Sequence, residues 1–259
     1  MFQRNPDKRR NPAISLVKVI AMFLIIHSHS DILFPDRISF LATGGALGNE
    51  LFFLVGGYLY STKRELTQTT LRRFIRLYIP TYIMTIVLYM FQIISIGDLT
   101  SPKEIVYRII WPTSFWFVSS IFVNGILFHI LFLKSVFSTL NRSIVFAVVF
   151  FTFNILIYIF FIPNKNVWIV EDYKFFGGMF YYKCIYSFAV FCIGYLIRYL
   201  DSNKKLSINE IVLFSGSLLS FIVFYTFKLF LNRGIIPMEF QLLSQPITAI
   251  CVIFILCGY

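Results

Sequence analysis

The sequence predicts an all-α fold, a polytopic bundle of transmembrane helices, from three observations. Of the 259 residues, 58% are hydrophobic and only 14% are charged, whereas globular domains average about 45–50% apolar residues. The chain contains 32 Phe and 15 Tyr residues, an abundance typical of lipid-facing and interfacial surfaces. The apolar residues also gather into long runs, and about 20 helical residues span a bilayer core about 30 Å thick.

Eight such runs follow one another along the chain, and we expect a helix from each. They cover residues 13–34, 41–61, 73–96, 113–133, 143–163, 178–198, 208–231 and 241–259. The polar segments between them are too short for a soluble domain, so we expect one integral-membrane domain over residues 1–259. The last run reaches Tyr259 without a polar cap or a basic flank. We therefore expect either a truncated chain or an unusually bare final helix.

The formal net charge of +11 favours contact with anionic membrane lipids over nucleic acid binding, because the basic residues lie mainly between the apolar runs. There, Lys and Arg set the orientation of a membrane protein and are enriched on its cytoplasmic side. The segment before the first run carries Arg9 and Arg10, and the third run begins beside Arg72 and Arg73. This distribution predicts a cytoplasmic N-terminus in a multi-pass protein of the plasma or inner membrane.

The sequence predicts no metal site. Its four cysteines lie within apolar runs and lack the spacing of metal ligands, so we interpret them as packing residues. They are Cys184, Cys192, Cys251 and Cys257.

The first run contains ionisable residues, which are costly inside a membrane helix and usually serve a function there. In the segment LVKVIAMFLIIHSHSD, Lys18 and His29 are eleven residues apart. At 100° per residue they lie within about 20° of each other, separated by roughly 16 Å along the helix axis. His27 is nine residues from Lys18 and points to the opposite side. One helix face is therefore expected to carry a cation near the cytoplasm and a proton acceptor near the outer surface.

Two other interpretations of these residues stay open. His27 and Asp31 form the pattern H-x-x-x-D, which some soluble CoA-dependent acyltransferases use with the histidine as general base. Alternatively, the Lys18 side chain extends to the inner membrane surface while both histidines lie in interfacial water.

Four segments within residues 13–122 share motifs, in order, with one protein family. ISLVKVIAMFLIIHSHS has its opening pattern of Arg or Lys, ten residues and His, at Lys18 and His29. The family's second segment is matched by GNELFFLVGGYLYS, and its R-x-x-R segment is matched by LRRFIRLYIPTY. The W-F/Y-L stretch of a later helix is matched by FWFVSSIF. Together they resemble the membrane-bound acyltransferase family 3. The chain departs from the family pattern at three points. Lys18 replaces the commoner Arg, Gly56 replaces Ser, and eight spans are predicted where the family usually has about ten.

The resemblance implies an integral-membrane O-acyltransferase. Such proteins move an acyl group, usually acetyl, from cytoplasmic acyl-CoA to a hydroxyl of a cell-surface or secreted polysaccharide. His29 is then expected to be the general base, because imidazole titrates near neutral pH, or an acyl carrier if a covalent intermediate forms. Glu50, at the family's acidic position, is expected either to orient His29 or to be a helix-start acid in interfacial water.

The cations of the third run suit the phosphates of acyl-CoA. Arg76 is four residues after Arg72 and three after Arg73, so an α-helix brings it onto a common face with each. Arginine binds phosphate oxygens bidentately, and Lys18 at a similar depth would complete the site, although ordinary membrane anchoring explains the same cluster. Trp116 is expected either to stack on the acceptor sugar or to act as an interfacial anchor.

Several remaining features leave alternatives open. Gly44, Gly45 and Gly48 permit either close helix approach or a ligand channel. His129 and Asn124 match no motif, and we interpret them as packing or hydrogen-bonding residues. Two other functions also stay open. One is a transporter or exporter of a glycan or lipid-linked sugar, with charged residues along its path, and the other is a non-catalytic scaffold of an envelope assembly.

Overall fold

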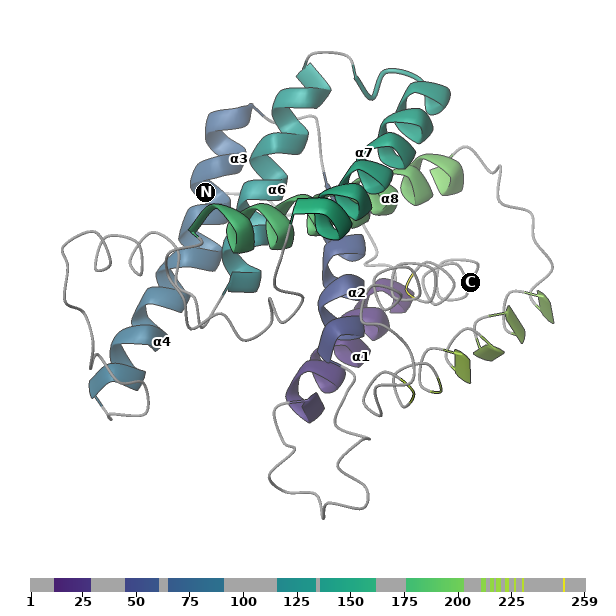
Figure 1. Ribbon diagram of the computed structural model, residues 1–259. Coiled ribbons are helices and arrows are strands. Elements are labelled where there is room, and N and C mark those ends of the chain that lie inside the picture. The colour runs from purple at the N-terminus through teal and green to yellow at the C-terminus, as the bar shows by residue number, and fades with distance from the viewer. Residues whose placement is uncertain are drawn as a thin grey trace. The chain divides into compact units, whose positions relative to one another are not determined.

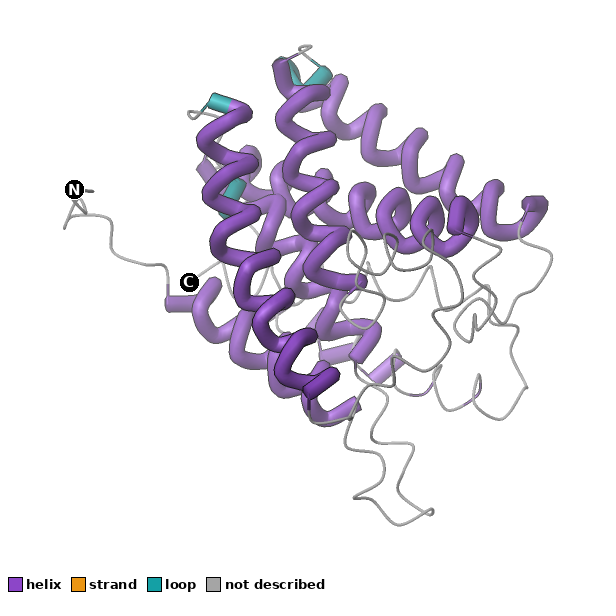
Figure 2. The backbone as a smooth tube through the Cα atoms, turned by 90° about the vertical axis from the view of Figure 1, so that its left-hand side faces the viewer, coloured by secondary structure: helices purple, strands orange, loops and turns teal. Residues whose placement is uncertain are grey.

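The computed structural model describes residues 12–28, 45–60, 65–90, 116–133, 136–161 and 176–202, and isolated positions between 211 and 249. Over these ranges every regular element is a helix and none is a strand (Figures 1 and 2). The predicted all-α fold is therefore confirmed.

Six of the predicted apolar runs correspond to described helices. These helices are α1 (Pro12–Ser28), α2 (Gly45–Tyr58), α3 (Leu66–Arg73), the π-helix η3 (Phe74–Tyr78), α4 (Ile79–Met90), α6 (Trp116–Leu133), α7 (Leu140–Phe161) and α8 (Phe176–Ser202). α3, η3 and α4 follow one another without a break and together form one helical rod. The two C-terminal runs, 208–231 and 241–259, fall largely outside the described residues.

The third helix begins earlier than the apolar pattern predicts. The apolar run starts at residue 73, whereas α3 starts at Leu66. Residues 66–71, LTQTTL, are too polar to be recognised as part of an apolar run, but they contain neither Gly nor Pro to break a helix. Arg72 and Arg73 therefore lie at the C-terminal end of α3 and not at the start of the helix.

By its contacts the chain divides into two compact units, and each is described by itself. Unit 1 consists of Met1–Tyr58 and Ile193–Tyr259, so it contains α1, α2 and the end of α8. Unit 2 is Leu59–Cys192 and contains α3, η3, α4, α6, α7 and the beginning of α8.

In unit 1, α1 packs against α2 through a stripe of buried side chains that recur every three or four residues. None of them is more than 5% exposed: Ile14, Val17, Ala21 and Leu24. This spacing places one apolar face of a helix against a neighbour. The opposite side of α1 is also apolar, with Val19 and Phe23 about two-thirds exposed at 65% and 64%.

Glycines of α2 allow its backbone to approach α1 closely. A Cβ atom at Gly48 would lie 2.6 Å from the Ala21 carbonyl oxygen and 2.8 Å from Cγ1 of Ile25. Gly45 lies in the same way against the side chain of Ser28. Close helix approach, one of the two roles predicted for these glycines, is therefore confirmed at both positions.

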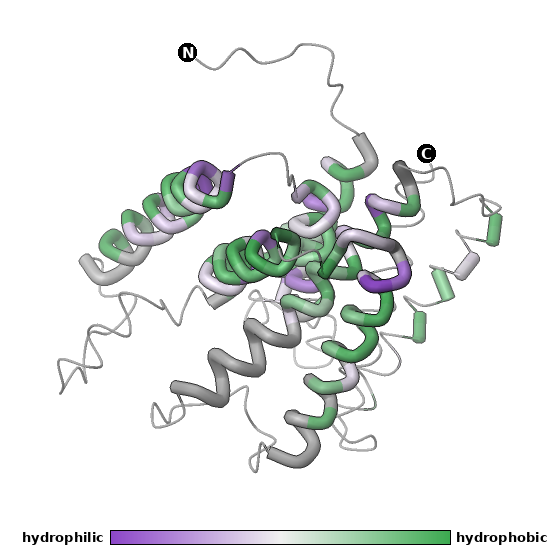
Figure 3. The backbone as a smooth tube through the Cα atoms, turned by 90° about the horizontal axis from the view of Figure 1, so that it is seen from above, coloured by the Kyte–Doolittle hydropathy of each residue, from purple (hydrophilic) through white to green (hydrophobic). Residues whose placement is uncertain are grey.

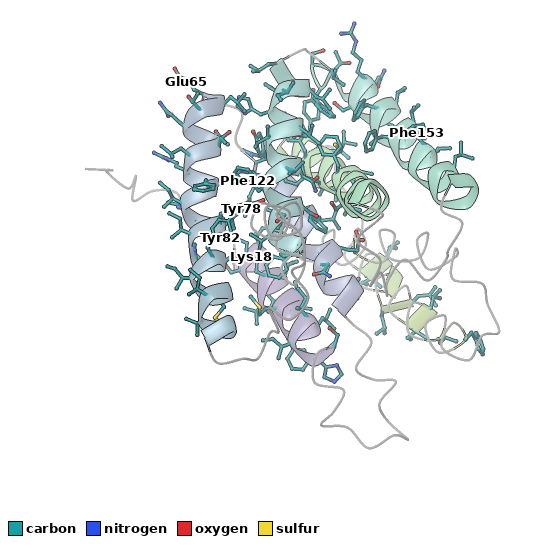
Figure 4. All side chains as sticks on the ribbon, turned by 60° about the vertical axis from the view of Figure 1, so that its left-hand side comes forward. Lys18, Glu65, Tyr78, Tyr82, Phe122 and Phe153 are labelled. Carbon is teal, nitrogen blue, oxygen red and sulfur yellow. The ribbon has the colours of Figure 1, made fainter. Side chains whose placement is uncertain are left out.

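In unit 2, aromatic side chains join the α3–η3–α4 rod to α6. The rings of Tyr78 and Phe122 meet edge to face with their centroids 4.8 Å apart, and Tyr82 lies 5.6 Å from Tyr78 (Figure 4). Elsewhere α6 contacts the segments that follow it, since Phe128 stacks on Phe137 at 4.5 Å and lies 5.6 Å from Phe191 of α8. α6 therefore links the rod to the later helices of its unit.

Hydrophobic residues recur along the described helices (Figure 3), and many of them are exposed. They include Ile83, Met84 and Ile86 of α4, and Val145, Val148 and Val149 of α7. Within the described ranges, no helix combines the length and the apolar character that crossing a membrane requires. The eight membrane spans stay a prediction.

We predict that Gly48→Ala destabilises the protein, because the added Cβ would overlap α1 backbone and overpacking of this kind costs about 1–3 kcal/mol. Gly216→Ala is a matched control, since no atom of the described residues lies within 4 Å of a Cβ there and alanine is the better helix former by about 1 kcal/mol. Thermal unfolding of the purified chain should give a lower midpoint for the first variant only. Equal midpoints would mean that α1 and α2 are not in close contact at Gly48.

Candidate functional site

A wide helical turn, the π-helix η3, directly follows Arg72 and Arg73 and contains Arg76. In η3 the backbone bonds run over five residues, as from the Ile79 N–H to the Phe74 carbonyl. Pro80 is the second residue of α4. Proline lacks an N–H and crowds the carbonyl four residues earlier, which here is that of Arg76. A break in the α-helical ladder at this point is therefore expected. Single π turns inside α-helices are frequent at functional sites.

The three arginines have different surroundings. Arg72 and Arg73 are half-buried, whereas Arg76 is exposed. A π turn contains more residues than an α turn, so it carries Arg76 further around the axis from Arg73 than their spacing predicts. Arg73 and Arg76 therefore do not share the environment that a common helix face would give them, since one is half-buried and the other exposed.

Arg73 contacts the backbone of α6 and two aromatic rings that lie outside α6. Its NH1 group donates to the Ile121 carbonyl at 3.2 Å. The guanidinium carbon lies 4.8 Å from the centre of the Tyr60 ring and 5.9 Å from that of Phe191, distances at which cations are attracted to aromatic faces. Among the described residues no carboxylate forms an ion pair with it. The guanidinium is thus held in place without its charge being neutralised there.

Gly125 makes room for this guanidinium. A Cβ atom on Gly125 would overlap NH1 and the central carbon of the Arg73 guanidinium. Ile121 and Gly125 are four residues apart and share one face of α6. That face therefore offers Arg73 a carbonyl acceptor and a niche without a side chain.

The ring of Tyr60 is held by a hydrogen bond to the same helix. The Tyr60 hydroxyl and Nδ1 of His129 are 2.6 Å apart, and both side chains are only 2% exposed. His129 is four residues after Gly125, so it continues the same face of α6. The predicted hydrogen-bonding role of His129 is confirmed.

A second buried polar contact joins α6 to α8. Nδ2 of Asn124 donates to Oγ of Ser187 at 2.9 Å, which confirms the predicted hydrogen-bonding role of Asn124. Within the described part of the chain, Asn124 Oδ1 and Ser119 Oγ are buried without a hydrogen-bond partner. Polar side chains on α6 thus bond to Tyr60, which precedes α3, and to Ser187 of α8.

The predicted residues of α1 lie in unit 1. Lys18 is exposed and directly follows the buried Val17 (Figure 4). His27 is half-buried and stacks on Phe23 at a centroid distance of 5.8 Å. His29 lies outside the described residues, so its predicted alignment with Lys18 stays a prediction.

Glu50 is buried in α2, at 4% exposure. It follows Gly48 by two residues, or about 200° around the helix, so it points away from the side on which Gly48 contacts α1. It lies one turn before Leu54, whose carbonyl is in close contact with Gly194 of α8. A direct contact between Glu50 and His29 stays a prediction, since His29 is not among the described residues.

Two further expectations concern a sugar site and a metal site. Trp116 is the first residue of α6, but its side chain lies outside what the structure describes. In the described ranges no three His, Cys, Asp or Glu side chains gather in a way that could hold a metal ion.

The contacts of Tyr60 and Gly125 with Arg73 were not predicted from the sequence. Tyr60 lies among many aromatic residues at the end of an apolar run, and Gly125 is one of 13 glycines. His129, a polar residue in an apolar helix, was the one available signal, because such a residue requires a hydrogen-bond partner when it is buried.

Comparison with known proteins identifies the family. The chain matches the family model of the acyltransferase domain, family 3, over residues 11–259. No curated protein and no solved structure gave a match. Because the match includes the segments of α1, α2 and the rod and extends to the last residue, the chain belongs to acyltransferase family 3.

Proposed function

We propose that the protein is an integral-membrane O-acyltransferase that transfers an acetyl or other acyl group from cytoplasmic acyl-CoA to a hydroxyl of a cell-surface or secreted polysaccharide. The observation that carries this proposal is Arg73, a half-buried cation for which the described residues supply no anion. A charge removed from water requires a partner. In a chain of an acyltransferase family, the phosphates of an acyl-CoA donor are the natural anion.

The other arginines extend this site along the rod. Arg72 precedes Arg73 directly, and Arg76 is exposed on η3. CoA carries a diphosphate and a ribose phosphate, so several cations are needed to neutralise it, and arginine supplies paired N–H donors to phosphate oxygens. We assign Lys18 as a further cation for the donor on the strength of the family spacing.

The acceptor hydroxyl requires a base, and the family pattern assigns this role to His29. Its imidazole takes the hydroxyl proton while the oxygen attacks the thioester carbonyl. The resulting imidazolium then returns that proton to the departing CoA thiolate. Glu50, a buried carboxylate of α2, stabilises the imidazolium through the weakly screening interior of the protein. Trp116 stacks on the acceptor sugar.

We propose a location in the plasma or inner membrane, with a cytoplasmic N-terminus and several spans. Members of this family are typically membrane-associated. The exposed apolar positions of α1, α4 and α7 support the proposal, because soluble proteins rarely expose large contiguous apolar surfaces.

The two histidines of the first run provide the sharpest test of the chemistry. With equal amounts of protein in the membrane, His29→Ala should reduce acylation of the surface glycan by about 100-fold or more, the contribution expected of a general base. His27→Ala should retain most of the activity, and mass spectrometry of the glycan measures both. The reverse result would transfer the role to His27 and Asp31. If deletion of the protein left acylated glycan inside the cell, an exporter would replace the acyltransferase.

The donor site is tested by equilibrium binding of acetyl-CoA to the purified chain. The double variant Arg73→Ala with Arg76→Ala should weaken binding by about 100-fold or more, since two lost charge-assisted hydrogen bonds at about 1.5 kcal/mol or more each amount to at least about 3 kcal/mol. Arg142→Ala is the control, because Arg142 is an exposed arginine whose side chain bonds only weakly to Ser138 at 3.4 Å. Unchanged affinity in a folded double variant would remove both arginines from the donor site.

A further inference from the structure

We propose that Tyr60 and His129 are positioning residues for Arg73, and that their hydrogen bond fixes the orientation in which the guanidinium receives a phosphate of the acyl-CoA donor. This inference rests on the proposed donor site. It adds two residues, distant in sequence, that no motif connects with the arginines.

The geometry around Arg73 requires a fixed support. The guanidinium has five N–H donors in one plane, and among the described residues only the Ile121 carbonyl accepts from it, at 3.2 Å. One hydrogen bond leaves the group free to rotate about that contact. The second support is the Tyr60 ring, whose centre lies 4.8 Å from the guanidinium carbon. Together a bond at one edge and a ring against one face define the plane.

The position of the Tyr60 ring is defined in turn by its hydroxyl. That group lies 2.6 Å from Nδ1 of His129. A hydroxyl both donates and accepts, so this bond forms with either tautomer of the imidazole. The rings of Phe128 and Phe191 lie 5.0 Å and 5.8 Å from Tyr60 and limit its sideways movement.

The same helix face binds every part of this arrangement. Ile121, Gly125 and His129 follow at intervals of four residues along α6, so they form one row. The first accepts from Arg73, the second makes room for its guanidinium, and the third holds the ring beneath it. Two apolar side chains could fill the space of Tyr60 and His129, but they would not fix each other's orientation. The hydrogen bond between Tyr60 and His129 does fix it, and we therefore assign this bond a positional role.

The inference predicts a specific loss in Tyr60→Phe, which retains the ring and removes only the hydroxyl. The affinity for acetyl-CoA should fall about three- to tenfold, the usual range for one hydrogen bond. The affinity for S-acetylpantetheine, the fragment of acetyl-CoA without nucleotide phosphates, should change less than about twofold by the same reasoning, because Arg73 has no phosphate to bind there. Equilibrium binding to the full chain, with its unfolding temperature, measures both. Equal losses for the two ligands would overturn the inference.

A double-mutant cycle separates this inference from the donor site itself. If Tyr60 acts through Arg73, Tyr60→Phe should have no further effect on acetyl-CoA binding once Arg73→Ala is present. Additive effects would show that Tyr60 acts independently and would overturn the inference alone. If Arg73→Ala itself leaves the affinity unchanged, the assignment of Arg73 to the donor site fails and the inference fails with it.

Two further variants keep the test decisive if Tyr60→Phe does not fold. His129→Asn retains a polar group near the position of Nδ1, so it should preserve most of the acetyl-CoA affinity. His129→Leu removes that polar group, so its affinity for acetyl-CoA should fall as in Tyr60→Phe. Ser187→Ala is the matched control, because it breaks a buried bond of 2.9 Å between α6 and α8 that does not involve Arg73. Loss of acetyl-CoA selectivity in Ser187→Ala as well would show that general loosening of α6 is the cause, and would contradict the positional role.

Discussion

The arrangement of unit 2 depends on one cation that is held by the protein but not neutralised by its described residues. Arg73 lies between the Tyr60 ring and the backbone of α6, with the Ile121 carbonyl as its hydrogen-bond acceptor there. Taking a guanidinium partly out of water without a counter-charge is unfavourable for the fold. An unfavourable group that is nevertheless firmly positioned is typical of binding sites, where the ligand supplies the missing charge.

The path of the main chain contributes to the same result. A regular α-helix from Leu66 onward would bring Arg73 and Arg76 to nearly the same face. The π turn at Phe74–Tyr78 separates them, so one is packed against α6 while the other is exposed. Pro80 makes such a break favourable because it cannot complete the α-helical ladder. The irregular turn therefore has a structural consequence: it gives Arg73 and Arg76, two arginines of one motif, different surroundings.

The sequence predicted the composition of the site better than its geometry. Six of the apolar runs identified described helices correctly, because an apolar run of some twenty residues is much longer than a typical strand. They misplaced the start of α3, since LTQTTL is helical but polar. Motif spacing identified Arg73, whereas Tyr60 could not be recognised. Its importance comes from a contact with His129, 69 residues away, and no local pattern records a contact of that separation.

The difference between the arginines also suits the ligand that we propose. CoA is a flexible molecule that carries a diphosphate and a phosphomonoester. Attracting this ligand and aligning it place opposite demands on a cation. The exposed side chain of Arg76 attracts the phosphates at long range, but an exposed arginine that is ordered by its ligand loses conformational entropy when the ligand binds. A guanidinium that is already fixed, as Arg73 is by a ring, a carbonyl and a glycine niche, has lost that freedom during folding. It can therefore align the thioester without a further entropic cost.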